Sequence, residues 1–310
     1  MDKVQVAEHF SNQADTWVQT SHEGFANHYP TADHRKRVVQ RLFKQWDAPL
    51  KVLDLGCGGG HLALALAEDG HDVLGIDQSP RMIEIANSSR QTASKDVRNR
   101  LRFVEGDIED AGVSPHSFDV VTAMGVIGYF PNDKAIFRIV DGALKPNGSF
   151  IVSSRNRLFN LVSLSHRTKR EINTDAAKDL IDEIASYQQE VSAEITQKMA
   201  TSLSEKAAFI SNQATLPPAA ASLPPLDEAA TMQSEARQHT PQELSESAQK
   251  NGFMTSSLHG IHPHLINPAA NQFLPAGVYN TLSTCLEALE DEPISLTWSS
   301  VFIAALKKTS

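Results

Sequence analysis

The sequence predicts an α/β protein with a mostly parallel sheet covered by helices on both faces. Residues 38–155 alternate between strand-like and helix-like segments, which is typical of parallel sheets. Five strand-like segments come in order: KVLDLG, HDVLGID, LRFVEGD, FDVVTAM and SFIVSS. Two more, TSSLHGI and SLTWSSVFIAALKK, lie near the C-terminus, so a seven-stranded sheet is expected.

Local signals support the helices that join these strands. A helix is expected from His61, directly after the glycines of VLDLGCGGG. Ser79 and Pro80 have the pattern of an N-cap followed by an early proline, so another helix is expected there. Near the C-terminus, TPQELSESAQKNGF begins with Thr240 as a cap and ends at the stop signal Gly252.

The organisation changes after about residue 155. Residues 171–216 contain neither Gly nor Pro, and apolar residues recur there at helical spacing, which predicts one long helix or two. Between 171 and 194 seven acids face one lysine, so a solvated acidic face is expected opposite the apolar stripe. The stripe either packs against the core or a second copy of the chain, as a homodimer, or forms a lid over the pocket.

The chain is therefore divided into four parts. Residues 1–37 are predicted to form an N-terminal helical segment covering the active site, and residues 38–160 the core that binds the ligand. Residues 161–239 are predicted to be a helical lid or insertion ending in a Pro and Ala linker at 214–230. Residues 240–310 supply a closing helix and the last two strands, with a helical insertion at 262–293.

The composition argues against several partners. The chain has 310 residues and a net charge of −9, so no nucleic-acid partner is expected. It contains no apolar run of about 20 residues and no recognisable signal peptide, which predicts a cytoplasmic protein without a membrane span. Cys57 and Cys285 are the only cysteines, and the histidines of HGIHPH lack acidic neighbours, so no metal site is expected.

The glycine turn does not match the fingerprint of a nicotinamide site. That fingerprint requires Gly or Ala where this chain has His61. Asp54, two residues before the turn, would disfavour a pyrophosphate and suit a ligand with an ammonium group. Asp77 ends the second strand where a carboxylate can bind the hydroxyls of a ribose. Asp107 follows the third strand, where it could accept a proton from an adenine amino group.

Five segments together resemble the successive motifs of class I S-adenosylmethionine-dependent methyltransferases: VLDLGCGGG, GIDQSPRMIEIA, FVEGDIED, FDVVTAMGVIGYF and LKPNGSFIVSS. The nearest group includes the ubiquinone- and menaquinone-type and sugar methyltransferases, in which a stretch similar to HFSNQADTW precedes the domain. The resemblance implies a Rossmann-like sandwich, S-adenosylmethionine as cofactor and a small-molecule methyl acceptor.

Carried over by position, the resemblance implies where the methionine part and the ribose of the cofactor lie. The floor under the methionine part would be formed by Asp54, Gly56, Cys57 and Gly58. Asp77 would hold the ribose.

The adenine would lie between side chains that follow the second and third strands. Gln78 and Met82 would flank the ring, although Met82 alone has the character of a core residue. Asp107, together with the backbone of Ile108, would read the adenine edge, or would serve only as a helix cap.

The methionine end would reach the fourth strand. Met124 and Gly125 would line it next to the substrate. Arg35 or Arg37, on the helix that leads into the first strand, would pair with the cofactor carboxylate, unless both are ordinary surface charges.

The catalytic base is not evident from the sequence. Many relatives have a histidine in the loop after the fourth strand, where this chain reads MGVIGYFPN. The other candidates lie in the N-terminal segment, in that loop, after the fifth strand and in HGIHPH: His28, Tyr29, Tyr129, His166 and His262. The predicted reaction is in-line O-methylation. The alternatives are N- or C-methylation, and a catalytically inactive, cofactor-binding regulatory subunit.

A local run of basic residues follows the fifth strand in SSRNRLFNLVSLSHRTKRE. In an open α/β sheet, ligands bind near the carboxyl ends of the strands, so this run would suit an anionic substrate. Alternatively, its arginines pair with the acids of the helix that follows.

Overall fold

The computed structural model describes residues 29–309 except 110–111, 214–235, 269, 271–273 and 275–276, together with Glu8, Ser11 and Asn12. Its centre is one seven-stranded sheet in the order β3-β2-β1-β4-β5-β7-β6. The strands are β1 (Lys51–Leu55), β2 (Asp72–Asp77), β3 (Leu101–Glu105), β4 (Phe118–Met124), β5 (Leu144–Arg155), β6 (Phe253–Pro263) and β7 (Ser299–Lys308). Only β7 runs antiparallel to its neighbours β5 and β6, which confirms the predicted mostly parallel sheet.

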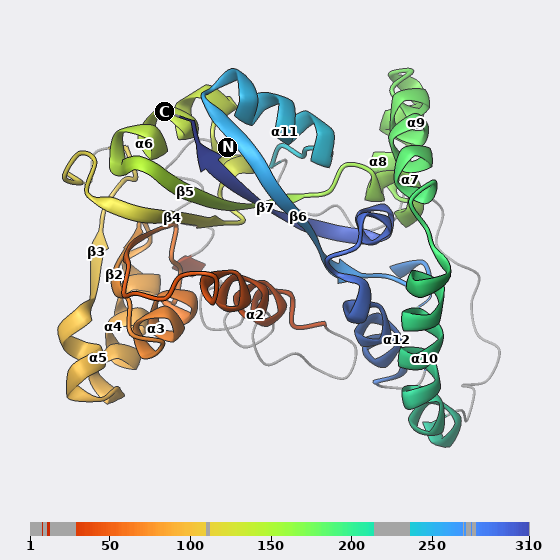
Figure 1. Ribbon diagram of the computed structural model, residues 1–310, viewed down its shortest axis with the longest axis horizontal. Helices are drawn as coiled ribbons and strands as arrows, with labels where there is room; N and C mark the ends of the chain where they lie inside the picture. The colour runs from red at the N-terminus through yellow and green to blue at the C-terminus, as the bar shows by residue number, and fades with distance from the viewer. Residues whose placement is uncertain are drawn as a thin grey trace.

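Helices cover both faces of the sheet (Figure 1). One face carries α2 (Thr31–Phe43), α3 (His61–Glu68), α4 (Pro80–Thr92) and α5 (Lys95–Arg100), and the other carries α6 (Asp133–Ala143) and α11 (Pro241–Lys250). Two apolar clusters fill the layers: one includes Val39, Leu66 and Ile151, and the other includes Phe137, Phe150 and Phe253. This arrangement buries the runs of Val, Ile and Leu on both sides, which explains why the strands read as continuously apolar.

The predicted helix signals are confirmed where the structure describes them. The Ser79 side chain accepts a hydrogen bond from the Met82 backbone, with Pro80 at the first helical turn. Thr240 and Glu243 form a reciprocal capping box at the start of α11. The short helix α5 was not predicted, and α2 runs across the expected boundary at residue 37.

The helical insertion consists of α7 (Phe159–Ser163), α8 (His166–Asn173), α9 (Ala177–Gln188) and α10 (Ala193–Gln213). The expectation of a uniformly solvated acidic face is wrong for two of its acids. Glu171 is 6% exposed and receives Arg157 at 2.7 Å, while Glu183 is 9% exposed and accepts the backbone N–H of Gln242 at 3.0 Å. These carboxylates are buried because they hold the insertion to β5 and to the start of α11. The linker at 214–230 lies outside the described residues.

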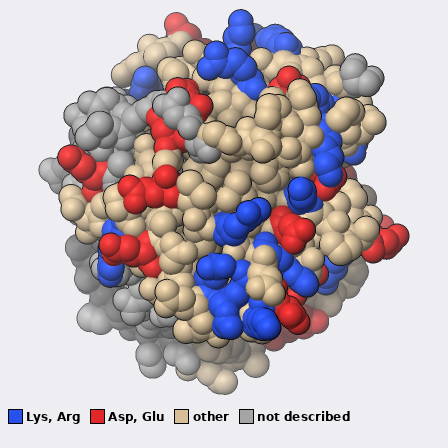
Figure 2. Space-filling model, turned by 90° about the vertical axis from the view of Figure 1, so that its left-hand side faces the viewer, with Lys and Arg blue, Asp and Glu red and all other residues tan. Residues whose placement is uncertain are grey.

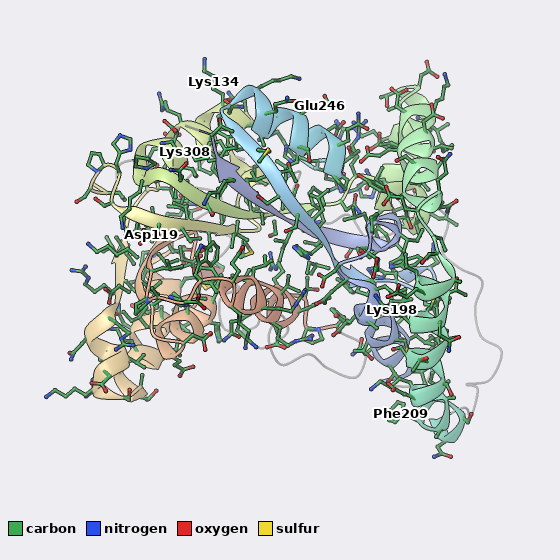
Figure 3. The ribbon with its side chains drawn as sticks, in the orientation of Figure 1. Asp119, Lys134, Lys198, Phe209, Glu246 and Lys308 are labelled. Atoms are coloured by element: carbon green, nitrogen blue, oxygen red, sulfur yellow. The ribbon has the colours of Figure 1, made fainter. Side chains whose placement is uncertain are left out.

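The far end of the insertion packs on a second helical segment, formed by α12 (Val278–Leu286) and the 3-10 turns η4 (Glu287–Leu289) and η5 (Pro293–Thr297). Ile195 on α10 shares a small apolar cluster with Leu289 and Ile294. Lys198, in the second turn of α10, bridges to Glu292 at 2.7 Å, and Phe209 lies near the end of the helix (Figure 3). Among the described residues, no helix is long and apolar enough to cross a membrane.

Candidate active site

The strand order places a crevice at the carboxyl ends of β1 and β4. The chain proceeds from β1 outward to β2 and β3, and then returns to the other side of β1 to form β4. Ligands of open α/β sheets bind at this kind of reversal, outside the carboxyl ends of the strands. The two segments that leave this edge are the glycine turn after β1 and the loop after β4, which begins with Gly125 and contains η2 (Ile127–Tyr129).

The glycine turn is tight and accepts only glycine at its first position. Gly56 has φ +67°, and a Cβ there would lie 2.5 Å from Cγ2 of Val126 in the loop after β4. The backbone N–H groups of Gly56 and Cys57 both donate to the Ile76 carbonyl on β2. The turn is therefore packed between β2 and the loop after β4, and its backbone approaches the crevice without a side chain.

Asp77 holds the glycine turn to the start of α4. Its two carboxylate oxygens accept the backbone N–H groups of Gly58 and Ser79, each at 2.9 Å. Burial raises the pKa of this carboxyl above its ordinary value, against the lowering effect of the two N–H donors. Each oxygen keeps a second lone pair, so the group retains the capacity to accept hydrogen bonds from a ligand's hydroxyls.

Asp54 lies beneath the turn, at the end of β1. It is 2% exposed, and its Oδ1 accepts the Thr122 hydroxyl at 2.7 Å. Burial, with a smaller contribution from the charge of Asp77, raises the pKa of Asp54 to about 7. Thr122 was not among the predicted site residues; its signal is a hydroxyl within the mostly apolar strand FDVVTAM.

The structure separates the two arginines that the sequence could not distinguish. Arg35 extends from α2 to the end of β4. Its Nη1 lies 2.8 Å from the position that a Cβ of Gly125 would occupy, and it donates to the Ser153 hydroxyl at 3.4 Å. Its Nε is buried and has no hydrogen-bond partner among the described residues. Burial, and then the nearby charge of Arg155, lowers the pKa of Arg35 to about 10.

Arg37 faces away from the crevice. It bonds to Asp33 at 3.1 Å and to Glu287 at 2.9 Å, and its side chain is 47% exposed. Arg41, one turn further along α2, pairs with Glu290 at 2.6 Å and with Asp291. These contacts tie α2 to the segment around η4.

The remaining cofactor positions fall into two groups. Met124 is half-buried and Gly125 is exposed with φ +79° at the end of β4, so both lie at the crevice. Met82 is 2% exposed among core residues, and the Cys57 sulfur lies only 2.9 Å from where a Cβ of Gly75 would be, so these two side chains point into the protein.

The positions predicted to read the adenine edge lie after β2 and β3. Gln78 is half-buried at the end of β2. Asp107 accepts the backbone N–H of Glu109 at 3.0 Å, as a turn cap does, and Ile108 packs partly against the core.

The catalytic candidates are not gathered at one point. His28 lies outside the described residues. Tyr29 is buried, donates to Glu287, and is held protonated because burial and that carboxylate raise the pKa of its phenol. Tyr129 is half-buried in η2, and His166 begins α8 with a buried Nδ1. His262 is half-buried at the end of β6, where its ring stacks on Tyr29 with centroids 4.5 Å apart.

The arginines of the basic run after β5 lie in two different environments. Arg157 is engaged by Glu171 and by Glu243, at 2.7 and 2.5 Å, which supports the alternative that arginines pair with acids of the following elements. Arg155 instead ends β5 close to Arg35. Elsewhere, Figure 2 shows Lys and Arg gathered on the lower part of the face that carries α4 and α5.

A protein family described as a methyltransferase domain matches residues 47–252, which span the glycine turn, Asp77 and the loop after β4. The chain belongs to the class I S-adenosylmethionine-dependent methyltransferase family. Membership confirms the predicted family.

Two relatives illustrate how far the sequence likeness of this methyltransferase extends. The ubiquinone biosynthesis O-methyltransferase of Xanthomonas campestris pv. campestris (strain B100) is 38% identical over 107 residues, which are 34% of this chain and 44% of that protein. The mitochondrial ubiquinone biosynthesis O-methyltransferase of Schizosaccharomyces pombe is 30% identical over 168 residues, 52% of this chain and 60% of that protein. The chain therefore spans about half the length of these relatives.

Solved structures agree on the fold of this methyltransferase. Magnesium protoporphyrin IX methyltransferase from Synechocystis PCC 6803, with bound SAH, is 15% identical with a TM-score of 0.53, covering 99% of this chain and 100% of that chain. A methyltransferase from Thermotoga maritima is 15% identical with a TM-score of 0.50, covering 98% and 99%. At such identities the likeness shows the Rossmann-like fold alone.

Proposed function

We propose that this protein transfers the methyl group of S-adenosylmethionine to a small molecule, with oxygen as the accepting atom. The observation that carries the proposal is that Arg35, at the end of β4, and Asp77, bonded to the glycine turn at the end of β2, lie at the same carboxyl edge of the sheet. A buried guanidinium with an unpartnered Nε suits a carboxylate, and a carboxylate with spare lone pairs suits two hydroxyls. The methionine tail and the ribose of the cofactor supply these groups.

The residues present fit the cofactor in charge as well as in placement. Asp54 lies near the end of β1, directly before the glycine turn, and its negative charge would neutralise that of the ammonium group in the methionine tail. Gly125 leaves space at the end of β4 because any side chain there would meet Arg35. When bound, the cofactor supplies a methyl group on a sulfonium, which leaves as a neutral thioether. The protein's task is then to align the acceptor and exclude water.

The choice of oxygen draws on the two ubiquinone biosynthesis O-methyltransferases, whose names specify O-methylation. A nitrogen or carbon acceptor is the second candidate because the loop after β4 holds Gly128 and Tyr129 where many relatives have a histidine. A catalytically inactive regulatory subunit is the third. Labelled S-adenosylmethionine incubated with a cell extract separates the three, since a labelled ether, amine or carbon product identifies the acceptor atom and no product favours the regulatory subunit.

The role of residues 161–239 as a lid also belongs to this proposal. It is supported by the contacts of Arg237, where this segment returns to the core. The Arg237 guanidinium donates to the carbonyls of Phe130 and Ile127 at 2.9 and 3.2 Å, and its backbone N–H donates to Gly128. A displaced insertion would therefore release the loop that lines the crevice. The homodimer and the cytoplasmic location stay predictions from the sequence.

Calorimetric titration with S-adenosylhomocysteine tests the proposed site. Saturable binding is expected, with none for NAD. Arg35→Gln and Asp77→Asn should each weaken binding at least tenfold, because each removes one charge-assisted contact worth about 1.5–3 kcal/mol. Arg37→Gln is the matched control and should bind like the parent protein. Equal affinity in the Arg35 and Arg37 variants would contradict the assignment.

A further inference from the structure

A small pocket lies at the edge of the sheet opposite the crevice. Its volume is about 350 Å³, and its lining is drawn from residues 40–49, at the end of α2 and before β1, together with Asp69 and His71, between α3 and β2. Strands β1 and β2 begin at this edge and end at the crevice, so this amino-edge pocket is separate from the cofactor positions. Small-molecule sites occupy roughly 300–1,000 Å³, so the volume suits a single ring system.

One wall of the amino-edge pocket is aromatic. The Phe43 and Trp46 rings meet edge to face with centroids 5.4 Å apart, and the Phe43 ring meets the His71 ring in the same way at 5.0 Å. Phe43 is 2% exposed and belongs to the core, whereas Trp46 is half-buried and keeps part of its surface open. A flat, unsaturated ligand can therefore stack on the indole of Trp46.

His71 presents a hydrogen-bond donor whose identity is fixed by the backbone. The Leu50 backbone N–H donates to Nδ1 of His71 at 3.2 Å. A backbone amide can only donate, so Nδ1 is the acceptor and the proton of the neutral ring is on Nε2. Burial lowers the pKa of His71, which keeps the ring neutral. No described residue accepts a hydrogen bond from Nε2, so this N–H is left for a ligand in the pocket.

Asp69 places a hydrogen-bond acceptor beside that donor. It lies two residues before His71, and its charge acts on the His71 ring. Its Oδ2 accepts the Gln40 amide at 2.8 Å, while its Oδ1 accepts from no described residue. The pocket thus presents an N–H and a carboxylate oxygen within one short segment. The complementary ligand edge is a ring nitrogen that accepts, next to an amino group that donates.

The charges around the amino-edge pocket disfavour an anionic ligand. Its ionisable lining consists of Lys44, Asp47, Asp69 and the neutral His71, so carboxylates outnumber ammonium groups. The Arg100 charge also reaches His71, but from outside the lining. A phosphate or carboxylate in the pocket would meet two like charges at the closest range. A neutral base is accommodated, since its amino group donates to a carboxylate in a charge-assisted hydrogen bond.

We infer that the amino-edge pocket is a second binding site, apart from the crevice, for an aminated heteroaromatic base with a cytosine-like edge. The ring stacks on Trp46, its ring nitrogen accepts from Nε2 of His71, and its amino group donates to Asp69. A uracil-like ring has the same shape with donor and acceptor exchanged, so it would set N–H against N–H and oxygen against carboxylate. The inference goes beyond the proposed function and does not depend on it.

Cytidine and uridine test this preference in the full-length protein. The probe is the indole N–H signal of Trp46 in a proton–nitrogen correlation spectrum, assigned by its loss in Trp46→Phe. Saturating S-adenosylhomocysteine keeps either nucleoside out of the crevice. Cytidine should shift this signal saturably and bind about tenfold more tightly than uridine, because uridine leaves both pocket groups unpaired. Equal binding of the two nucleosides, or no shift with cytidine, would overturn the inference.

Replacement of one carboxylate separates recognition from a merely structural effect. Asp69→Asn should reduce the preference for cytidine from about tenfold to less than about threefold, since an amide donates to uridine as well as it accepts from cytidine. Asp72→Asn, at an exposed carboxylate outside the pocket, is the matched control and should keep the parent preference. An unchanged preference in Asp69→Asn, or an equal loss in Asp72→Asn, would overturn the inference.

Binding of S-adenosylhomocysteine provides an independent readout of the fold. Both variants should bind it within about twofold of the parent protein, because neither carboxylate lies at the crevice. If the parent does not bind it, the proposed function fails. The Trp46 signal still locates nucleoside binding in that case, so the amino-edge pocket is judged separately.

Discussion

Replacing Asp54 with asparagine tests the electrostatics under the glycine turn. The carboxyl is 2% exposed, and burial raises its pKa from an ordinary 3.8 to about 7. Asparagine has nearly the same shape and keeps an oxygen for the Thr122 hydroxyl. The change therefore removes the ionisable group and leaves the packing in place.

The sign of the effect follows from proton binding. Because the folded pKa lies above the unfolded one, the folded state binds more protons, and this contribution to stability is complete below about pH 4. It is lost as the pH rises through about 7. A shift of about 3 units amounts to about 4 kcal/mol, of which about 3 kcal/mol falls between pH 5 and pH 8.

Urea unfolding of the parent and of Asp54→Asn at pH 5 and pH 8 measures this directly. The contributions of titratable groups common to both proteins cancel. The free energy of unfolding of Asp54→Asn, minus that of the parent, should therefore rise by about 3 kcal/mol from pH 5 to pH 8. Asp119→Asn is the control, because Lys145 holds the pKa of Asp119 below its ordinary value. A difference between Asp54→Asn and the parent that is equal at both pH values would refute the reasoning.

Five further substitutions test stability by chemical denaturation. Gly56→Ala should cost about 3 kcal/mol, from its positive φ and the contact with the loop after β4, whereas Gly142→Ala, with open space around it in α6, should gain about 0.5–1 kcal/mol. Arg157→Gln should cost about 2 kcal/mol because Glu171 stays buried without its cation, and an unchanged midpoint would show that the pair is not needed. Thr240→Ala should cost about 1 kcal/mol by breaking the capping box, with Thr240→Ser restoring most of it.

The sequence predicts the sheet well because its information is local. The strands β1, β2 and β4 are short, largely apolar runs that end at or next to glycine or aspartate, and caps such as Ser79 and Thr240 act within one helical turn. The short helix α5 was missed because its six residues carry almost no apolar period, and Val97 is its only buried side chain. Signals of this kind depend only on residues close together in the sequence, so they can be recognised from one sequence alone.

The site is less predictable because its geometry depends on contacts between distant segments. Arg35 and Arg37 are two residues apart on one helix, and only the packing of α2 against β4 and η4 decides which of them is buried. The contacts of His262 are with hydroxyls 231 residues before it and 38 residues after it. Glu171 likewise reads as one of many surface acids until the position of Arg157 is known.

The ion pairs between α2 and the η4 segment have a consequence for the order of assembly. Arg37 and Arg41 bond to carboxylates 250 and 249 residues further along the chain. During synthesis these partners emerge from the ribosome long after the glycine turn has been made, and contacts of such separation are slow to close. A nascent chain carrying β1 to β5 therefore lacks the ion pairs that tie α2 to the segment around η4.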